Sequence, residues 1–260
     1  MKIGISTASM YGKKYTEEAL EYFSKNNVEC AEVFLSSFSE YTKDFGKKLL
    51  DNKGNVEVCS IHALNSQFEG QLFSRSERQY ADALEIFKGA LKVGEMVSAK
   101  LYVLHGPQQM KYTKYVTNYE FFGQRTAELA KICCDYGLML TWENVHWTHY
   151  NHSSFMQKLL PYCQEPIGCT LDIKQAAQSN ETVDKYIFDM QGRIKNLHIV
   201  DFDQDGRLVL PCRGYYDYKE LFNKMGKYDG SVMIEVYDGC YKHPEELIES
   251  YNEFVKKYKI

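Results

Sequence analysis

Four residues of the types that bind divalent cations each stand at the end of a short apolar segment. They are Glu143 in LMLTWEN, Asp172 in IGCTLDI, His198 in IKNLHIV and Glu235 in SVMIEVY. Three carboxylates and one imidazole are a ligand set typical of a single divalent cation. A carboxylate beside such a cation can also remove and return a proton, so the same residues could carry out acid–base chemistry.

The separations between these residues indicate how they are positioned. From one to the next, the four lie 29, 26 and 37 residues apart. One strand-plus-helix unit of an α/β barrel takes about 30 residues. Four consecutive strands of such a barrel would therefore direct one ligand each toward the same end.

The rest of the chain repeats this architecture. Helical periodicity marks 78–98, 116–136 and 243–257, where Pro244 is placed to begin the last helix. Strands alternating with helices favour a parallel sheet, and eight repeats favour a single-domain α/β protein, a (β/α)₈ TIM barrel over 1–260. An open doubly wound sheet is the alternative, but no glycine-rich phosphate loop follows the first segment. The predicted strands are 2–6, 29–35, 56–62, 100–105, 138–143, 167–172, 194–200 and 232–237.

Composition excludes some classes of function. The 260 residues are 44% hydrophobic, enough for a large core, and carry a net charge of −4, which argues against a nucleic-acid partner. No apolar run approaches the roughly 18 residues of a membrane helix. The eight cysteines form no CxxC pair and are expected to be buried free thiols. We therefore expect a cytoplasmic protein that binds neither membrane nor nucleic acid, with a homo-oligomer left open.

Several strand ends carry short motifs that together resemble a known family. The chain is similar to the sugar-phosphate isomerase/epimerase-like proteins of the xylose-isomerase-like barrel superfamily. The resemblance covers most of the chain. It rests on CSIH at 59–62, LHGP at 104–107, WEN at 142–144, LD at 171–172, LHIVD at 197–201 and IEVY at 234–237.

The resemblance implies roles for the four residues. Glu143, Asp172, His198 and Glu235 would bind one divalent cation, with Mn²⁺, Mg²⁺, Co²⁺ and Zn²⁺ left open. The two glutamates would also be the catalytic acid and base. The implied reaction is the isomerisation or epimerisation of a small sugar, ketose or related hydroxy-carbonyl compound through a metal-stabilised enediolate. Chemistry supports this, because a divalent cation stabilises the charge created when a proton leaves the carbon next to a carbonyl.

Neighbouring residues are expected to orient a carbohydrate substrate. Lys174 and Arg213 suit a carboxylate or phosphate group, although surface salt bridges would explain them equally well. The second strand could contribute Glu32 or Phe34, and Asp201 is expected to support an imidazole or a lysine. The residues expected to bind substrate are His62, His105, His146, Trp147, Lys174, Gln175 and Arg213. An alternative for the HWTHYNH segment is a zinc site made by His146, His149 and His152.

Two departures from the family pattern concern the substrate. Gln175 stands where many members have a histidine, and Arg213 lies in LPCRGYYDY where a glycine-rich segment is usual. Both argue against an apurinic-site endonuclease with three zinc ions, which would need metal ligands at these places. The sequence is also compatible with a metal-dependent dehydratase or lyase acting on a polyol or keto-sugar, and with a non-catalytic sugar-binding barrel.

Overall fold

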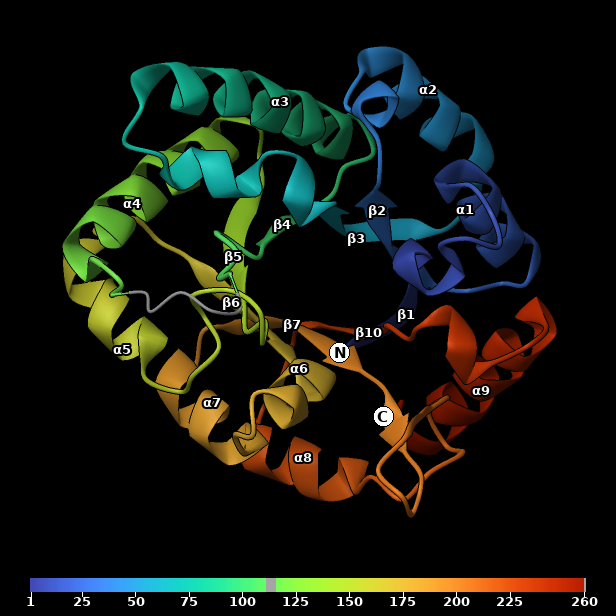
Figure 1. The fold of residues 1–260 in the computed structure, drawn as a ribbon. Coiled ribbons are helices and arrows are strands. Elements are labelled where there is room, and N and C mark those ends of the chain that lie inside the picture. Colours follow the sequence, from blue (N-terminus) through green and yellow to red (C-terminus); the bar gives the residue numbers. More distant parts are fainter. Residues whose placement is uncertain (111–115, 260) are drawn as a thin grey trace.

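The strands of the protein close into a ring. A computed structural model describes residues 1–110 and 116–259. Eight parallel strands pair in the order β1-β10-β7-β6-β5-β4-β3-β2 and form a closed barrel (Figure 1). The predicted TIM barrel is thereby confirmed, and every predicted strand overlaps an observed one. The barrel strands are β1 (Lys2–Ser6), β2 (Cys30–Leu35), β3 (Glu57–Ala63), β4 (Leu101–Leu104), β5 (Met139–Glu143), β6 (Gly168–Asp172), β7 (Ile194–Ile199) and β10 (Ser231–Ile234).

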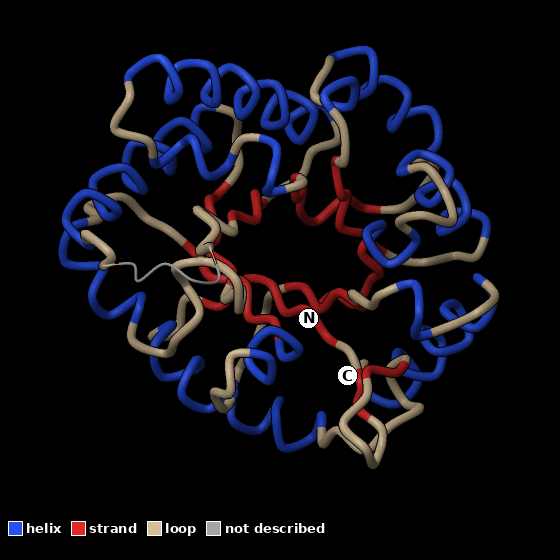
Figure 2. The backbone as a smooth tube through the Cα atoms, viewed as in Figure 1, coloured by secondary structure: helices blue, strands red, loops and turns tan. Residues whose placement is uncertain are grey.

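Helices surround the ring of strands (Figure 2). The α-helices are α1 (Thr16–Lys25), α2 (Lys43–Asn52), α3 (Glu77–Met96), α4 (Tyr119–Asp135), α5 (Phe155–Leu159), α6 (Ile173–Gln178), α7 (Val183–Met190), α8 (Tyr218–Met225) and α9 (Pro244–Tyr258). Short 3₁₀ helices are η1 (Thr7–Met10), η2 (Phe38–Glu40), η3 (Asn65–Gln67), η4 (Glu69–Phe73), η5 (Leu160–Tyr162) and η6 (Asp238–Cys240). The three periodic segments coincide with α3, α4 and α9. Pro244 occupies the first turn of α9 as predicted, and the Glu246 carboxylate accepts the His243 N–H.

A short hairpin follows β7 and lies outside the barrel. Its strands, β8 (Asp201–Phe202) and β9 (Leu208–Val209), are antiparallel. The Asp201 carboxylate accepts the backbone N–H groups of Phe202, Cys212 and Tyr216, so it holds this connection together. The expected contact of Asp201 with an imidazole or a lysine is therefore wrong.

Alternation along the strands separates the outer core from the barrel interior. On β5, Trp142 faces the helices and its indole N–H donates to Thr126 of α4. The neighbouring Thr141 points inward, where its hydroxyl lies 3.0 Å from that of Thr170 on β6. Among the described residues, no helix is long and apolar enough to cross a membrane. All eight cysteines are free.

Gly4 lets β1 and β2 approach each other closely. Gly4 is paired with Cys30, and a Cβ added at Gly4 would lie 2.2 Å from the Cys30 carbonyl oxygen. Two residues further along, Ser6 is paired with Glu32, a buried carboxylate. The missing side chain of Gly4 therefore sets the strand spacing on which the position of Glu32 depends.

Replacing Gly4 with alanine should destabilise the barrel. The added methyl group meets backbone, which cannot rotate away, so we expect the free energy of unfolding to fall by about 1–3 kcal/mol. Gly70 is the matched control, because a Cβ at that position meets nothing within 4 Å. Urea denaturation should show Gly70→Ala close to wild type. Equal stability of the two variants would contradict the proposed tight contact.

Candidate metal centre and active site

The four predicted ligands converge at one end of the barrel. Glu143 and Asp172 end β5 and β6, His198 lies near the end of β7, and Glu235 directly follows β10. One ligand atom from each of the four lies within 4.8 Å of all the others. All four side chains are buried, with exposed fractions of 0–11%. The structure thus brings together residues that are up to 92 positions apart, between 143 and 235.

His198 stands between a supporting carboxylate and the open part of the site. Its Nε2 lies 3.1 Å from Glu32 Oε2. Glu32 also accepts hydrogen bonds from Ser60 at 2.7 Å and Asn196 at 2.9 Å. His198 Nδ1 has no hydrogen-bond partner and lies 3.0 Å from Glu235 Oε2. A carboxylate that holds the far nitrogen of a metal-binding imidazole is a common supporting arrangement. Sequence analysis identifies Glu32 only as a strand-end residue, and its signal is a lone charge within the apolar segment CAEVFL.

Asp172 divides its two carboxylate oxygens between two tasks. Oδ1 accepts the backbone N–H of Gln175 at 2.8 Å and so caps the N-terminus of α6. The Asn144 side chain accepts the Asp172 N–H and donates to its carbonyl, which fixes the backbone. Oδ2 is buried without a hydrogen bond. One oxygen of Asp172 therefore remains for a cation. Sequence analysis did not identify the role of Asn144, although it belongs to the WEN motif.

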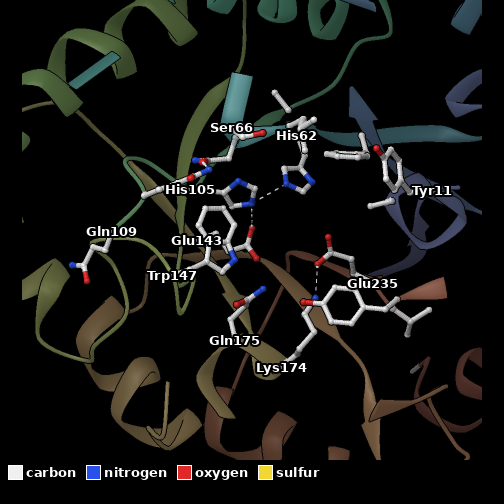
Figure 3. A pocket seen from close by; sticks show the side chains of 18 residues that line it. Tyr11, His62, Ser66, His105, Gln109, Glu143, Trp147, Lys174, Gln175 and Glu235 are labelled. Carbon is white, nitrogen blue, oxygen red and sulfur yellow. Dashed lines mark hydrogen bonds and ion pairs between the residues drawn. The ribbon is translucent and has the colours of Figure 1, made fainter. Parts of the chain in front are cut away.

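Two histidines form a chain of contacts that begins at Glu143 (Figure 3). His105 Nε2 lies 3.0 Å from Glu143 Oε2 and 2.8 Å from His62 Nε2. Burial alone would lower the pKa of His105, but attraction to Glu143 and Glu69 outweighs it and raises the pKa to about 9. Burial and the neighbouring His105 lower the pKa of His62 to about 4. At neutral pH, His105 is therefore the charged member of the pair.

Lys174 is a buried cation and not a surface residue. Its Nζ lies 3.1 Å from Asp172 Oδ2 and 3.3 Å from Glu235 Oε2. Burial opposes the charge of Lys174, but these two carboxylates outweigh it and raise the lysine pKa. Burial also disfavours the charge of Glu235, but attraction to Lys174 and His198 outweighs it and lowers the carboxyl pKa. The expectation of a surface salt bridge is therefore wrong for Lys174.

The residues present fit a divalent cation. Glu143 Oε2, Asp172 Oδ2 and His198 Nδ1 are buried and have ion-pair contacts but no hydrogen bond. Folded proteins seldom leave buried polar atoms without hydrogen bonds, and a bound cation would satisfy them. Burial, then repulsion from Glu143 and Glu235, outweighs the attraction of Lys174 and raises the pKa of Asp172 to about 7. The site thus holds more negative charge than its own cations neutralise. Three oxygens and one nitrogen suit Mn²⁺, Mg²⁺, Co²⁺ or Zn²⁺.

A cavity of about 480 Å³ opens above the four residues. Its floor is polar, with Glu143, Glu235 and Lys174. Four aromatic residues line its wall. Sequence analysis identified Trp147 and considered Phe34 but missed Tyr11 and Tyr237. The lining residues are Ala8, Tyr11, Phe34, His62, Ala63, Leu64, Asn65, Ser66, His105, Gln108, Gln109, Glu143, Trp147, Lys174, Gln175, Glu235, Val236 and Tyr237.

Five of the seven expected substrate-binding residues line this cavity, and two do not. His62, His105, Trp147, Lys174 and Gln175 are among the lining residues. The remaining expectations need correction. The first, His146, is not a lining residue, and its Nδ1 lies 2.6 Å from Oε1 of Gln175, which does line the cavity. The second, Arg213, pairs with Glu253 of α9 on the surface, because the hairpin after β7 carries that segment away from the cavity.

The other histidines of HWTHYNH do not converge. His149 lies 2.9 Å from the Thr117 hydroxyl, and His152 lies 3.2 Å from that of Tyr119. Within the described ranges, none of the residue groups able to hold a metal includes His146, His149 or His152. The alternative of a zinc site in this loop is therefore not supported. Two further groups do share residues with the main set: one contains His62, His105 and Glu143, and the other contains Glu32, His62 and Glu235.

Comparison with known families agrees with the barrel fold. The family model described as "Xylose isomerase-like TIM barrel" matches residues 18–258. The chain belongs to this family. No curated protein matches it in sequence.

Solved structures share the family fold at low sequence identity. D-psicose 3-epimerase with D-tagatose from Clostridium cellulolyticum H10 has a TM-score of 0.77 and 15% identity over 100% of this chain and 98% of the other. The IOLI protein with a bound zinc atom has a TM-score of 0.75 and 18% identity, covering 98% and 97%. The probable 3-DHS dehydratase AsbF from Bacillus anthracis has a TM-score of 0.75 and 12% identity, covering 98% and 99%. At these identities the likeness shows the fold.

The charge on His105 predicts how stability depends on pH in the metal-free protein. Its pKa is raised from 6.5 to about 9 on folding. The stabilisation is therefore complete below pH 6.5 and is lost as the pH rises through 9. Between these values, the stability advantage of wild type over His105→Gln should shrink by on the order of 3 kcal/mol.

Urea denaturation at a series of pH values, with a chelator present, measures this difference. Glu143→Gln is the matched control, since it removes the charge that helps to hold the His105 proton. This variant should lose much of the pH dependence. A constant difference between wild type and His105→Gln across the range would contradict the assignment of a charged His105.

Proposed function

We propose that this protein is a divalent-metal-dependent isomerase or epimerase of a small sugar, ketose or related hydroxy-carbonyl compound. One observation carries the proposal: Glu143 and Glu235 both reach the cavity floor and both lie within 3.4 Å of His198 Nδ1. A non-catalytic sugar-binding barrel would not need two buried carboxylates facing the ligand from separate strands. The epimerase activity named for a protein with the same fold agrees with this proposal.

Glu143, Asp172, His198 and Glu235 would hold the cation. When bound, the cation would polarise the substrate carbonyl and stabilise the negative charge of the enediolate. The zinc bound by the IOLI protein supports a metal in this fold, and Glu32 would keep His198 oriented for it.

The two glutamates would move the proton. Glu143 has the charged His105 beside it, and Glu235 has Lys174. Burial opposes ionisation of Glu143, but His198 and His105 outweigh it and lower the carboxyl pKa. Both groups are therefore carboxylates at rest and can accept a proton from a substrate carbon. Return of the proton by the same carboxylate to the neighbouring carbon would isomerise the sugar. Epimerisation would need the other glutamate to deliver a proton to the opposite face of the same carbon, and the charged neighbour of that glutamate, His105 or Lys174, would supply this proton.

The cavity wall would orient the substrate and exclude water. The Trp147 ring lies 5.8 Å from the His105 ring, and Phe34 lies 5.0 Å from His62, so the cavity has aromatic surfaces beside its polar floor. Such surfaces pack against the C–H faces of sugars. The Gln175 side chain offers its amide nitrogen to substrate hydroxyl groups, since its oxygen contacts His146. A polar floor beneath an apolar wall is the usual arrangement of a small-molecule site.

The structure gives no support to the endonuclease alternative. At the two places where zinc ligands would be needed, Gln175 carries an amide, and Arg213 pairs with Glu253 on the surface. A dehydratase remains a second candidate, because AsbF has the same fold and dehydration begins with the same proton removal. The products distinguish the two reactions.

Replacing either glutamate by glutamine should abolish turnover. The amide cannot accept the proton, so kcat/KM should fall by about 10²–10⁴-fold for Glu143→Gln and for Glu235→Gln. The assay would use purified protein with Mn²⁺ and a panel of ketoses and aldoses, with products separated by chromatography. Arg213→Ala is the control and should keep full activity. An active glutamine variant would overturn the acid–base assignment, and water loss from the substrate would favour the dehydratase.

Gln175→Ala should weaken substrate binding without changing the metal content. The backbone N–H of Gln175 donates to Asp172 and is retained by alanine, whereas the Gln175 amide faces the cavity. Losing one hydrogen bond to the substrate should raise KM by roughly tenfold. Elemental analysis of wild type and variant gives the metal content. A variant that loses metal would show that the amide belongs to the ligand sphere.

A further inference from the structure

The Lys174 ammonium contacts carboxylate oxygens that a bound metal would need as ligands. It is in the first turn of α6, two residues after Asp172, and only 2% of it is exposed. Its ammonium contacts Asp172 Oδ2 at 3.1 Å and Glu235 Oε2 at 3.3 Å. Figure 3 shows Lys174 reaching Glu235 across the floor of the cavity.

Asp172 has no separate oxygen for each of the two cations, the Lys174 ammonium and a metal ion. Its Oδ1 is occupied by the Gln175 N–H, so only Oδ2 remains. Glu235 Oε2 is likewise close to both Lys174 and His198 Nδ1. A divalent cation held by these residues would therefore need the two oxygens that the ammonium now contacts.

Lys174 is also the main fixed cation of the cavity. Among the described lining residues, it is the only lysine or arginine. Glu143, Asp172 and Glu235 are buried around it, and burying a carboxylate without a compensating charge is strongly unfavourable. Without Lys174, a metal-free site would have too little positive charge to stay folded in this form.

We propose that Lys174 is a built-in competitor of the metal: its ammonium neutralises Asp172 and Glu235 in the metal-free protein and is displaced from them when a divalent cation binds. This inference rests on the metal site of the proposed function and adds a residue that lowers metal affinity. The site stays assembled without metal, and the metal is exchangeable.

A contact that the ammonium already makes could hold it after displacement from the carboxylates. The Tyr237 ring lies 4.8 Å from Lys174 Nζ, within the range of a cation–π contact. Tyr237 is 47% exposed and lines the same cavity. A small rotation toward this ring keeps the charge stabilised. It also places the ammonium in the cavity beside the substrate instead of on the metal ligands.

Metal affinity of a neutral variant tests this inference. Lys174→Met keeps the length of the side chain and removes its charge. Isothermal titration of chelator-treated protein with Mn²⁺ should show a dissociation constant about tenfold lower than that of wild type, because the competing charge is gone. Adding Mn²⁺ should also raise the melting temperature of the variant more than that of wild type.

Lys224→Met is the matched control. Lys224 also pairs with two carboxylates, Asp184 and Glu220, but on the surface. Its removal should leave Mn²⁺ affinity unchanged. If Lys174→Met does not fold without metal, it can be folded with Mn²⁺ and titrated with a competing chelator, which gives the same constant.

The outcomes separate this inference from the proposed reaction. Tighter Mn²⁺ binding by Lys174→Met than by wild type supports competition between the ammonium and the metal, whether or not an isomerase substrate is found. Mn²⁺ binding by the variant with none by wild type supports it most strongly. Equal or weaker affinity of Lys174→Met overturns it, as does a complete lack of Mn²⁺ binding by both proteins. Isomerase activity with unchanged affinity would retain the proposed function and reject the role of Lys174.

Discussion

The arrangement of the site follows from one constraint, the burial of several carboxylates at the mouth of a parallel barrel. Glu143, Asp172 and Glu235 place oxygens within 4.8 Å of one another, Glu32 lies on the far side of His198, and all four side chains are at most 11% exposed. Such a cluster is unstable unless positive charge is placed among its members. His198, His105 and Lys174 supply part of that charge. The fold therefore places each histidine or lysine on a strand end or first helical turn next to the carboxylate that needs it.

Each of the two glutamates that face the cavity has a different cationic neighbour. Glu143 is paired with an imidazole that belongs to a chain of two histidines, whereas Glu235 is paired with a primary ammonium. The two carboxylates therefore differ in how readily they would release a proton once they have gained one. That asymmetry suits a reaction in which one group removes a proton and the other delivers one.

The sequence predicts the barrel well because its strands are apolar segments rich in β-branched residues, each bounded by polar helices. It also predicts the four converging residues, since strand ends of a parallel barrel meet at one face. The supporting hydrogen bonds cannot be predicted in this way, because they join residues far apart in the sequence. Asn144 and Asp172 are 28 positions apart, and Glu69 and His105 are 36 positions apart. Arg213 was misplaced for a related reason: periodicity does not reveal that Asp201 folds the connection after β7 into a hairpin.

The contact between Glu32 and His198 joins residues 166 positions apart. During synthesis, the carboxylate on β2 leaves the ribosome roughly 10–30 s before its imidazole partner, at typical elongation rates. Through that interval, packing of the first strands around Glu32 would bury its carboxylate with only the hydroxyls of Ser6 and Ser60, and His62 at 3.7 Å, as partners. Closure of a half-barrel would therefore bury this carboxylate without its closest imidazole, a cost that only the complete ring removes.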